Sequence, residues 1–190
     1  MHASGSPERP EKWCGETWVV GMAHEIERKF LVVGDGWQRG SRRSLSIRQA
    51  YLARPDATVV RVRIVDEREG FITIKSAPPG FIRSEFEYVI PVADALQLLR
   101  FRTGCVIKKR RHIVPAGGFN WEVDVFDGDH QGLVIAEVEL ADPDARLELP
   151  DWVGREVTGD PQYYNSNLAH RRFAANALSL AEPETGMRAA

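Results

Sequence analysis

The residues best suited to chemistry begin near the start of the chain, in the stretch 24–33 (HEIERKFLVV). Apolar residues recur there at every second position with charged residues between them, a pattern typical of a β-strand. Because the side chains of a strand alternate between its two faces, we expect Glu25, Glu27 and Lys29 on one face. On a face turned to water they would form an ordinary solvated edge. On a buried face they would need a metal ion or opposite charges beside them, since unpaired buried charge is costly.

The same pattern returns in later stretches, each of which we expect to be a strand. These stretches span residues 44–54, 58–66, 71–76, 81–91, 105–115, 119–126 and 133–140. One face of most of them is largely apolar, whereas the other carries charges at steps of two. The expected charged face comprises Glu25, Glu27, Lys29, Arg61, Arg63, Lys75, Arg83, Glu85, Glu87, Lys109, Arg111, Glu122, Asp124, Glu137 and Glu139.

The sign of these charges is segregated by strand, which bears on their role. Basic side chains stand in pairs on stretches 58–66 and 105–115, and acidic ones on stretches 119–126 and 133–140. Like charges side by side repel each other, so a shared ligand of opposite charge explains them best. Carboxylate pairs suit hard divalent cations, and arginine and lysine pairs suit phosphate oxygens. The alternative is the wet face of an ordinary antiparallel sheet.

If the charges point inward, the strands predict an α+β fold built on an eight-stranded antiparallel β-barrel, a tunnel with a charged interior that is flanked by helices. Residues 92–99 have apolar side chains at helical spacing, and 150–157 and 161–180 are further helix candidates, the last with Asp160 and Pro161 at its start. In stretch 105–115 a register slip by one would place Lys108 and Arg110 inside. We prefer Lys109 and Arg111 inside, because Glu122 and Asp124 then lie at a matching distance from the intervening turn.

Composition narrows the class of protein. The 190 residues carry a formal net charge of -2, which disfavours a nucleic-acid binder. Cys14 and Cys105 are far apart and form no CxxC pair, and the chain shows no signal peptide, which fits a reducing cytoplasm. No apolar run approaches the ~20 residues that span a bilayer, so no membrane partner is expected.

The ends of the chain differ from its middle. Residues 1–21 contain Ser, Gly, Pro and scattered charge without a sustained period, and we expect a disordered tail. The alternative is a short ordered arm that uses Trp13 and Trp18. A single domain is expected over residues 22–180, followed by a frayed C-terminus at 181–190.

The motif Glu25-Ile26-Glu27-Arg28-Lys29 resembles the ExExK signature of the CYTH, or triphosphate tunnel metalloenzyme, superfamily. The pairs that follow it do so in the family's order, and the resemblance covers roughly residues 23–173. These pairs are Arg61-x-Arg63, Thr73-x-Lys75, Arg83-x-Glu85-x-Glu87, Lys109-x-Arg111, Glu122-x-Asp124 and Glu137-x-Glu139. The segments WEVDVFDG, AEVEL and GDPQYYNSNLA look most like the short, stand-alone bacterial branch, whose members resemble inorganic triphosphatases more than cyclases.

The resemblance implies a triphosphate and a divalent metal, Mg²⁺ or Mn²⁺, held in the tunnel. The implied substrate-binding residues are Lys29, Arg61, Arg63, Lys75, Arg83, Lys109 and Arg111. The implied metal ligands are Glu25, Glu27, Glu85, Glu87, Glu122, Asp124, Glu137 and Glu139. Glu25, Glu27 and Lys29 are the catalytic candidates, and which carboxylate acts as base is left open. A second copy of the chain, in a homodimer, is a compatible partner.

The function expected first is metal-dependent hydrolysis of a linear triphosphate, above all inorganic triphosphate. A nucleoside or thiamine triphosphatase and a class IV adenylate cyclase are alternatives on the same scaffold, and a polyphosphate- or nucleotide-binding sensor is the non-enzymatic one. His112, His130 and His170 fit no metal-ligand spacing and are expected to be structural or on the surface. Tyr163 and Tyr164 either plug one tunnel mouth or simply pack.

Overall fold

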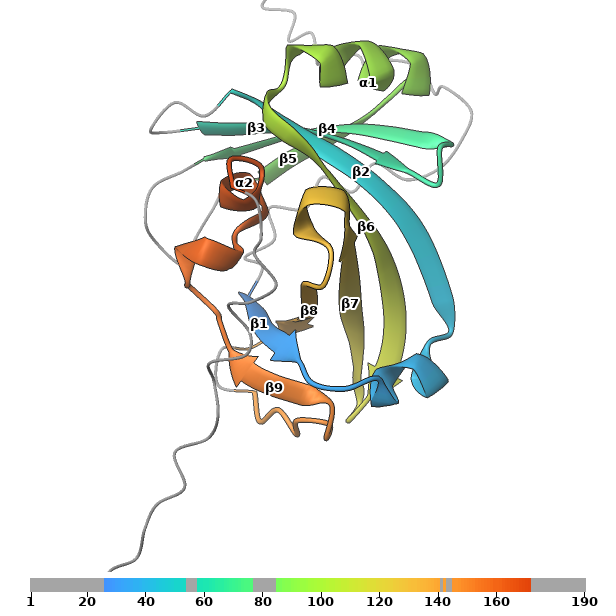
Figure 1. Ribbon diagram of the computed structural model, residues 1–190, viewed down its shortest axis with the longest axis vertical. Coiled ribbons are helices and arrows are strands. Elements are labelled where there is room, and N and C mark those ends of the chain that lie inside the picture. Colours follow the sequence, from blue (N-terminus) through green and yellow to red (C-terminus); the bar gives the residue numbers. More distant parts are fainter. Residues whose placement is uncertain (1–25, 54–57, 77–84, 141, 143–144, 172–190) are drawn as a thin grey trace, which may run out of the picture.

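The computed structural model describes residues 26–53, 58–76, 85–140, 142 and 145–171. Its strands form one antiparallel sheet in the order β5-β4-β3-β2-β6-β7-β8-β1-β9 (Figure 1). Their bounds are β1 Ile26–Val32, β2 Arg43–Ala53, β3 Thr58–Val65, β4 Glu69–Ser76, β5 Glu85–Ile90, β6 Thr103–Ala116, β7 Phe119–Asp127, β8 Val134–Leu140 and β9 Val153–Glu156. Within the described residues, each stretch that we expected to be a strand therefore forms one.

Helices are short and few in the described part of the chain. They are the α-helices α1 Val92–Leu98 and α2 Asn165–Leu168 and the 3-10 helices η1 Gly36–Gly40, η2 Leu99–Phe101, η3 Gly128–His130 and η4 Pro161–Tyr163. The helix expected at 92–99 is confirmed. Of these described helices, none is both long and apolar enough to cross a membrane.

The helix predicted at 150–157 is wrong, because this segment pairs with β1 as β9. The amide of Val33 donates to the carbonyl of Trp152 at 2.9 Å, and the amide of Val157 donates to that of Lys29 at 2.8 Å. A β-carbon at Gly154 would lie 2.9 Å from a methyl of Val33 and 3.0 Å from the carbonyl oxygen of Leu31, so a larger residue here would force β1 or its side chains to shift. Pairing with a neighbouring strand thus decides the local structure here.

The long helix predicted at 161–180 is also wrong within the residues described, which end at 171. Tyr164 is extended between η4 and the four-residue α2, so the two pieces are not continuous. The predicted start is right: Asp160 caps the segment, and its carboxylate accepts from the amide of Gln162 at 3.0 Å, with Pro161 in the first turn.

The predicted closure of the sheet into an eight-stranded barrel is not confirmed. The described residues form nine strands, and their ladders run from β5 to β9 without a ladder between those two. β9 occupies the edge of β1 that closure would need. What the structure supports is a curved, predominantly antiparallel sheet with few helices, whose two faces differ (Figure 1).

The convex face of the sheet is apolar. Over β2 and β3, the residues Ala50, Val62 and Ile64 pack against Ala95 and Leu99 of the α1–η2 segment. Over β1, β6, β7 and β8, a second core surrounds the fully buried Trp121. The ring of Trp121 makes edge contacts with Phe30 and Trp152, at centroid distances of 5.6 and 5.4 Å. Burial of this face fixes the register of the sheet.

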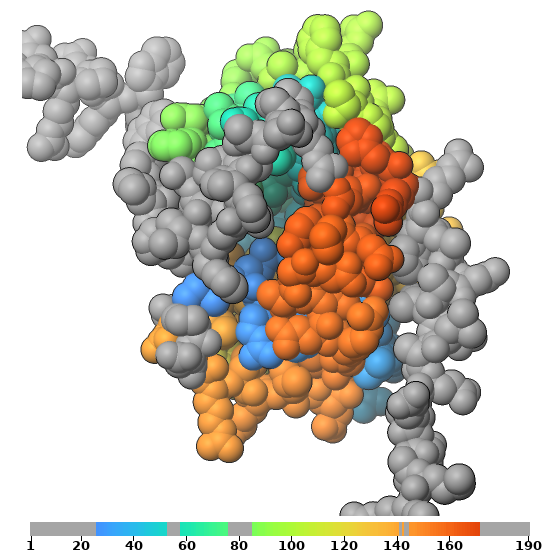
Figure 2. Space-filling model, turned by 90° about the vertical axis from the view of Figure 1, so that its left-hand side faces the viewer, coloured from blue at the N-terminus to red at the C-terminus, as the bar shows by residue number. Residues whose placement is uncertain are grey.

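The concave face is charged at one end and apolar at the other, where the sequence predicted charge throughout. Leu31, Ile107 and Phe126 form the apolar end, and Leu168 and Ala169 from the C-terminal segment pack on it. Figure 2 shows this segment, coloured orange to red, lying over part of β1. Tyr163 is partly buried and packs against this apolar end too, so the choice between a plug and simple packing stays a prediction.

Candidate functional site

The sheet register places the predicted charges of β1, β3–β5 and β6–β8 on the concave face. Residues that pair directly across two antiparallel strands point to the same side. Lys29 lies opposite Glu137, and Glu137 lies opposite Glu122. Arg111 lies opposite Asp124. The preferred register of β6 is therefore confirmed, and the exposed Lys108 and Arg110 point to the convex side.

The first of two groups of charges, the acid-rich cluster, lies on β1, β6, β7 and β8. It comprises Glu27, Lys29, Lys109, Arg111, Glu122, Asp124 and Glu137. The ammonium of Lys29 lies 2.5 Å from carboxylate oxygens of both Glu27 and Glu137. Arg111 holds Asp124 through two bonds, Nε to Oδ1 at 2.8 Å and Nη2 to Oδ2 at 2.7 Å. Every member is paired, so the cluster forms one continuous ion network.

Burial and neighbouring charges shift the pKa values of groups in the acid-rich cluster in opposite directions. Burial favours a neutral Glu137, but Lys29 and Arg111 outweigh it and hold the pKa of this carboxyl well below its usual value. Burial also favours the neutral form of Lys29, which would lower its pKa, but the charges of Glu137 and Glu27 outweigh burial and raise this pKa. At Glu27, by contrast, burial and the charge of Glu137 outweigh the charge of Lys29, and the pKa is raised. Glu27 is thus the carboxyl of this pair that takes up a proton more readily.

The second group, the base-rich cluster, lies on β3, β4 and β5. It comprises Arg61, Arg63, Lys75, Glu85 and Glu87. Glu87 accepts from Arg63 at 2.8 Å and from the hydroxyl of Thr73 at 2.6 Å, and Arg61 reaches it at 3.2 Å. Lys75 pairs with Glu85. Three cations face two carboxylates here, whereas four carboxylates face three cations in the acid-rich cluster.

Two donors of the base-rich cluster have no partner among the described residues. The Nε atoms of Arg61 and Arg63 are buried and make no hydrogen bond there. Burial, together with the charge of Arg61, lowers the pKa of Arg63. A buried donor without a partner is costly, and an anion that accepted from it would remove that cost. Phosphate oxygens suit such arginine donors well.

The two clusters act on each other across the concave face. The charge of Arg111 contributes to the lowered pKa of Arg63. Tyr51, whose pKa is raised mainly by burial, is also influenced by Arg61 and Lys29, one from each cluster. The buried Tyr51 and Gln49 of β2 therefore lie between the clusters. The sequence prediction did not include Tyr51, because an aromatic residue at an alternating strand position is typical of a core.

A divalent cation fits this face by the chemistry of its donors. Carboxylate oxygens are the ligands that Mg²⁺ and Mn²⁺ prefer, and Glu122 and Glu137 are cross-strand neighbours, as are Glu27 and Glu139. Within the described ranges, no three His, Cys, Asp or Glu side chains already form a metal cage. Glu122, Asp124 and Glu137 instead pair with Arg111. Binding a cation would therefore require these ion pairs to rearrange.

Two of the predicted site residues lie outside the described part of the chain, and a third lies apart from the two clusters. Glu25 and Arg83 lie outside the described residues. Glu139 lies opposite Glu27 but is exposed, beyond the network of ion pairs described above. His130 is structural, as predicted: it is buried, and its Nε2 lies 2.8 Å from the carbonyl of Leu168 in the C-terminal segment.

Comparisons with known proteins agree on one family. The model of the CYTH domain matches residues 23–171. An inorganic triphosphatase of Acetivibrio thermocellus is 45% identical over 153 residues, covering 80% of this chain and 97% of that protein. One from Nitrosomonas europaea is 37% identical over 150 residues, covering 76% of this chain and 96% of that protein. A solved structure of an inorganic triphosphatase has a TM-score of 0.58 at 36% identity and covers 76% of this chain and 93% of that one.

Proposed function

This chain belongs to the CYTH domain family, and on that premise we propose that it is a divalent-metal-dependent inorganic triphosphatase. The reaction adds water to a terminal phosphorus of a linear triphosphate and breaks the bond from that phosphorus to the bridging oxygen. Phosphate and pyrophosphate leave, and the proton of the water passes to a carboxylate or to solvent. The observation that supports this most is the pair of unpartnered arginine donors, Arg61 Nε and Arg63 Nε, on the same face of the sheet as the carboxylates of the acid-rich cluster.

The base-rich cluster binds the substrate in this proposal. Arg61, Arg63 and Lys75 offset the negative charge of the phosphates, and the buried Nε donors gain acceptors that they lack without substrate. Lys29, Lys109 and Arg111 approach from the other side, so the chain of phosphates is held at both flanks. Electrostatic positioning of this kind is the main contribution that a protein makes to phosphoryl transfer.

The acid-rich cluster holds the metal in this proposal. Glu122, Asp124 and Glu137 are the ligands that we assign, with Glu27 and Glu139 at its margin. When bound, a divalent ion would neutralise charge that builds on the phosphate oxygens. Glu27 is our candidate for accepting the proton of the attacking water, because its raised pKa makes it a stronger base than an ordinary glutamate. Cytoplasmic location and a homodimer remain predictions from the sequence.

A substrate panel tests the function. The full chain is incubated with Mg²⁺ or Mn²⁺ and with inorganic triphosphate, ATP or thiamine triphosphate, and phosphate and cyclic nucleotide are measured. We expect phosphate release from inorganic triphosphate to be fastest and to stop when the metal is chelated. Cyclic AMP would favour the cyclase alternative, and binding without turnover would favour the sensor.

A substitution of Glu27 tests its role. Glu27→Gln should lower kcat by about 100-fold or more, since general base catalysis contributes roughly 10²–10⁴. The circular dichroism spectrum should not change. Glu148→Gln, an exposed glutamate in the loop before β9, is the matched control and should keep wild-type turnover. Undiminished activity of Glu27→Gln would refute the assignment of the base while leaving the function intact.

A further inference from the structure

A groove of about 710 Å³ lies on the opposite, convex side of the sheet, between η1 and strands β6–β8. Its volume falls within the ~300–1,000 Å³ typical of small-molecule sites. Trp37 of η1 and the half-buried Val125 and Val134 supply its apolar lining. Arg42, Ser44 and His112 supply polar groups around that lining. We call this depression the basic groove.

The charge of the basic groove is positive. Its lining includes the exposed Arg42 and, among the described residues, no carboxylate, while the register places the side chain of Arg43 on the concave side. The register places the exposed Arg110 directly beside Val125, which adds a further cation at the rim. The pKa of His112 is lowered by burial and by the charge of Arg110, as expected where the local field is positive. None of these cations takes part in the ion pairs of the concave face.

The polar groups of the groove are held in place. The hydroxyl of Ser41 lies 3.0 Å from Nδ1 of His112. The His112 ring meets the buried ring of Trp37 edge-on, at a centroid distance of 4.8 Å. This packing fixes η1 on the sheet, so that the groove does not have to form when a ligand arrives.

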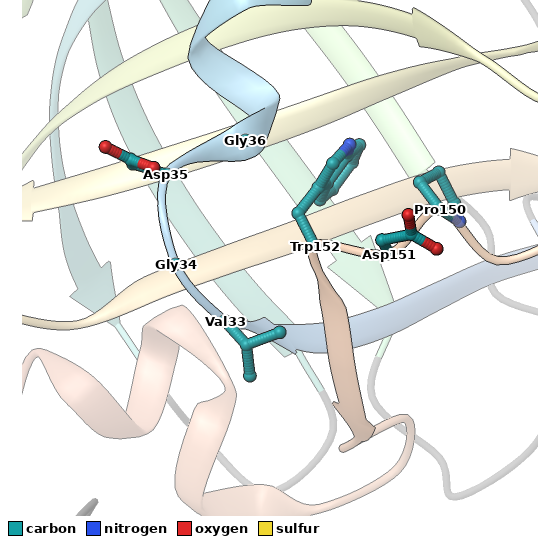
Figure 3. A pocket seen from close by; sticks show the side chains of 7 residues that line it. All are labelled: Val33, Gly34, Asp35, Gly36, Pro150, Asp151 and Trp152. Carbon is teal, nitrogen blue, oxygen red and sulfur yellow. The ribbon is translucent and has the colours of Figure 1, made fainter.

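A neighbouring depression provides an internal contrast. It shares Gly34 with the basic groove, and its lining includes Asp35, Asp151 and Trp152 (Figure 3). Figure 3 shows the Trp152 ring beside this backbone, with the Asp35 carboxylate pointing away from it. The lining of this depression thus includes two aspartates and no cation, whereas the described lining of the basic groove includes no carboxylate.

We propose that the basic groove binds a nucleoside phosphate, at a site separate from the triphosphate-binding face. The half-buried Val125 and Val134 give the planar base an apolar surface, and Arg42 with Arg110 suits the phosphate. Inorganic phosphate would satisfy only the cations, and a free nucleoside only the lining. Both parts of the ligand are therefore needed for affinity.

Calorimetric titration of the full chain with ADP, without metal, tests this site. ADP should bind at least tenfold more tightly than adenosine or inorganic phosphate. Arg42→Glu should weaken ADP binding at least tenfold and leave triphosphate hydrolysis unchanged. Arg39→Glu is the matched control, because Arg39 is an exposed arginine of η1 outside the lining, and it should bind ADP normally.

A second variant separates this site from the concave face. Arg63→Ala should keep ADP binding in the basic groove. Loss of binding in Arg63→Ala with normal binding in Arg42→Glu would place ADP on the concave face and overturn the proposal. Equal affinity for ADP and inorganic phosphate, no ADP binding at millimolar concentration, or self-association in place of binding would overturn it too. Triphosphate hydrolysis measured in parallel keeps failure here distinct from failure of the proposed function.

Discussion

The two charged clusters differ in the balance of their charges and in the burial of their innermost ion pairs. In the acid-rich cluster the side chains of Lys109 and Asp124 are 2% and 0% exposed, whereas in the base-rich cluster Lys75 and Glu87 are 29% and 31% exposed. Deep burial requires each charge to have a partner, because an unpaired buried charge is costly. In the base-rich cluster cations outnumber carboxylates, and two buried arginine donors have no partner among the described residues. The capacity to bind an anion therefore lies where pairing is incomplete.

The largest difference between the clusters should appear in stability. Asp124→Asn leaves the ammonium of Lys109 without its charged partner in a buried site, and should lower the free energy of unfolding by about 3–5 kcal/mol. The matched change Glu85→Gln, at the more exposed pair with Lys75, should cost at most about 1 kcal/mol. Urea unfolding measures both values.

A double substitution sharpens the stability prediction. Asp124→Asn combined with Lys109→Met removes the stranded charge and should recover a large part of the lost stability. If the single variant is as stable as the wild type, the two clusters do not differ in the way that burial predicts.

Kinetics should separate the clusters next. Arg63→Ala should raise KM for triphosphate at least tenfold, because it removes a phosphate-binding donor. Glu137→Gln should lower kcat about 100-fold or more and raise the concentration of Mg²⁺ needed for half-maximal rate. Initial rates over a matrix of substrate and metal concentrations give both parameters. Identical effects of the two variants on KM and on the metal requirement would break the proposed division of roles.

Acid should act with opposite sign on two glutamates, Glu87 of the base-rich cluster and Glu27 of the acid-rich cluster. Thr73, Arg63 and Arg61 outweigh burial and hold the pKa of Glu87 below its usual value of 4.5. Ionised Glu87 therefore stabilises the fold above about pH 4.5, and this contribution is lost as the pH falls further. Glu87→Gln should cost about 1 kcal/mol at pH 7 and progressively less below pH 4.5.

Glu27 provides the reverse case within the acid-rich cluster. Its pKa is raised, so its ionised form is disfavoured by folding, and Glu27→Gln should not destabilise the protein at pH 7. Unfolding curves of both variants between pH 3 and 7 test the contrast. A larger loss of stability for Glu27→Gln than for Glu87→Gln at pH 7 would reverse it.

An ion pair outside both clusters should give the smallest effect. Arg28 on β1 holds Glu156 on β9 through two bonds, at 2.9 and 2.6 Å, with much of both side chains exposed. Glu156→Gln should cost about 0.5 kcal/mol near neutral pH, measured as a small fall in Tm. The pair lowers the pKa of Glu156, so this cost should vanish in acid. A cost near that of Asp124→Asn would show that burial is not what distinguishes the pairs.

The alternating pattern was enough to predict most strands and which side chains share a face. Lys109 and Arg111 could be assigned inward because a strand has a strict period of two, which the buried Lys109 and exposed Lys108 bear out. The C-terminal strand β9 could not be predicted this way. Its four residues, Val153–Glu156, show no alternation, and they are extended because they pair with β1.

Pairing between distant segments also explains the other misses. Whether the ends of a sheet meet depends on its global curvature, which no local pattern encodes, so eight closed strands were predicted where the described chain has nine in an open order. In the sequence, Ile107 and Phe126 are typical of ordinary core residues. Nothing near them in the sequence indicates that α2 covers them from the concave side. For the same reason Tyr51 could not be linked to the charged residues around it.

The strand β6 serves both sides of the sheet with alternate residues: Lys109 and Arg111 contribute to one binding face, and Arg110 and His112 border the groove on the other. Inserting or deleting one residue ahead of Lys108 would exchange these two sets at once. A change in the length of β6 before Lys108 should therefore damage both surfaces together, whereas a substitution on β6 reaches only the surface on its own side.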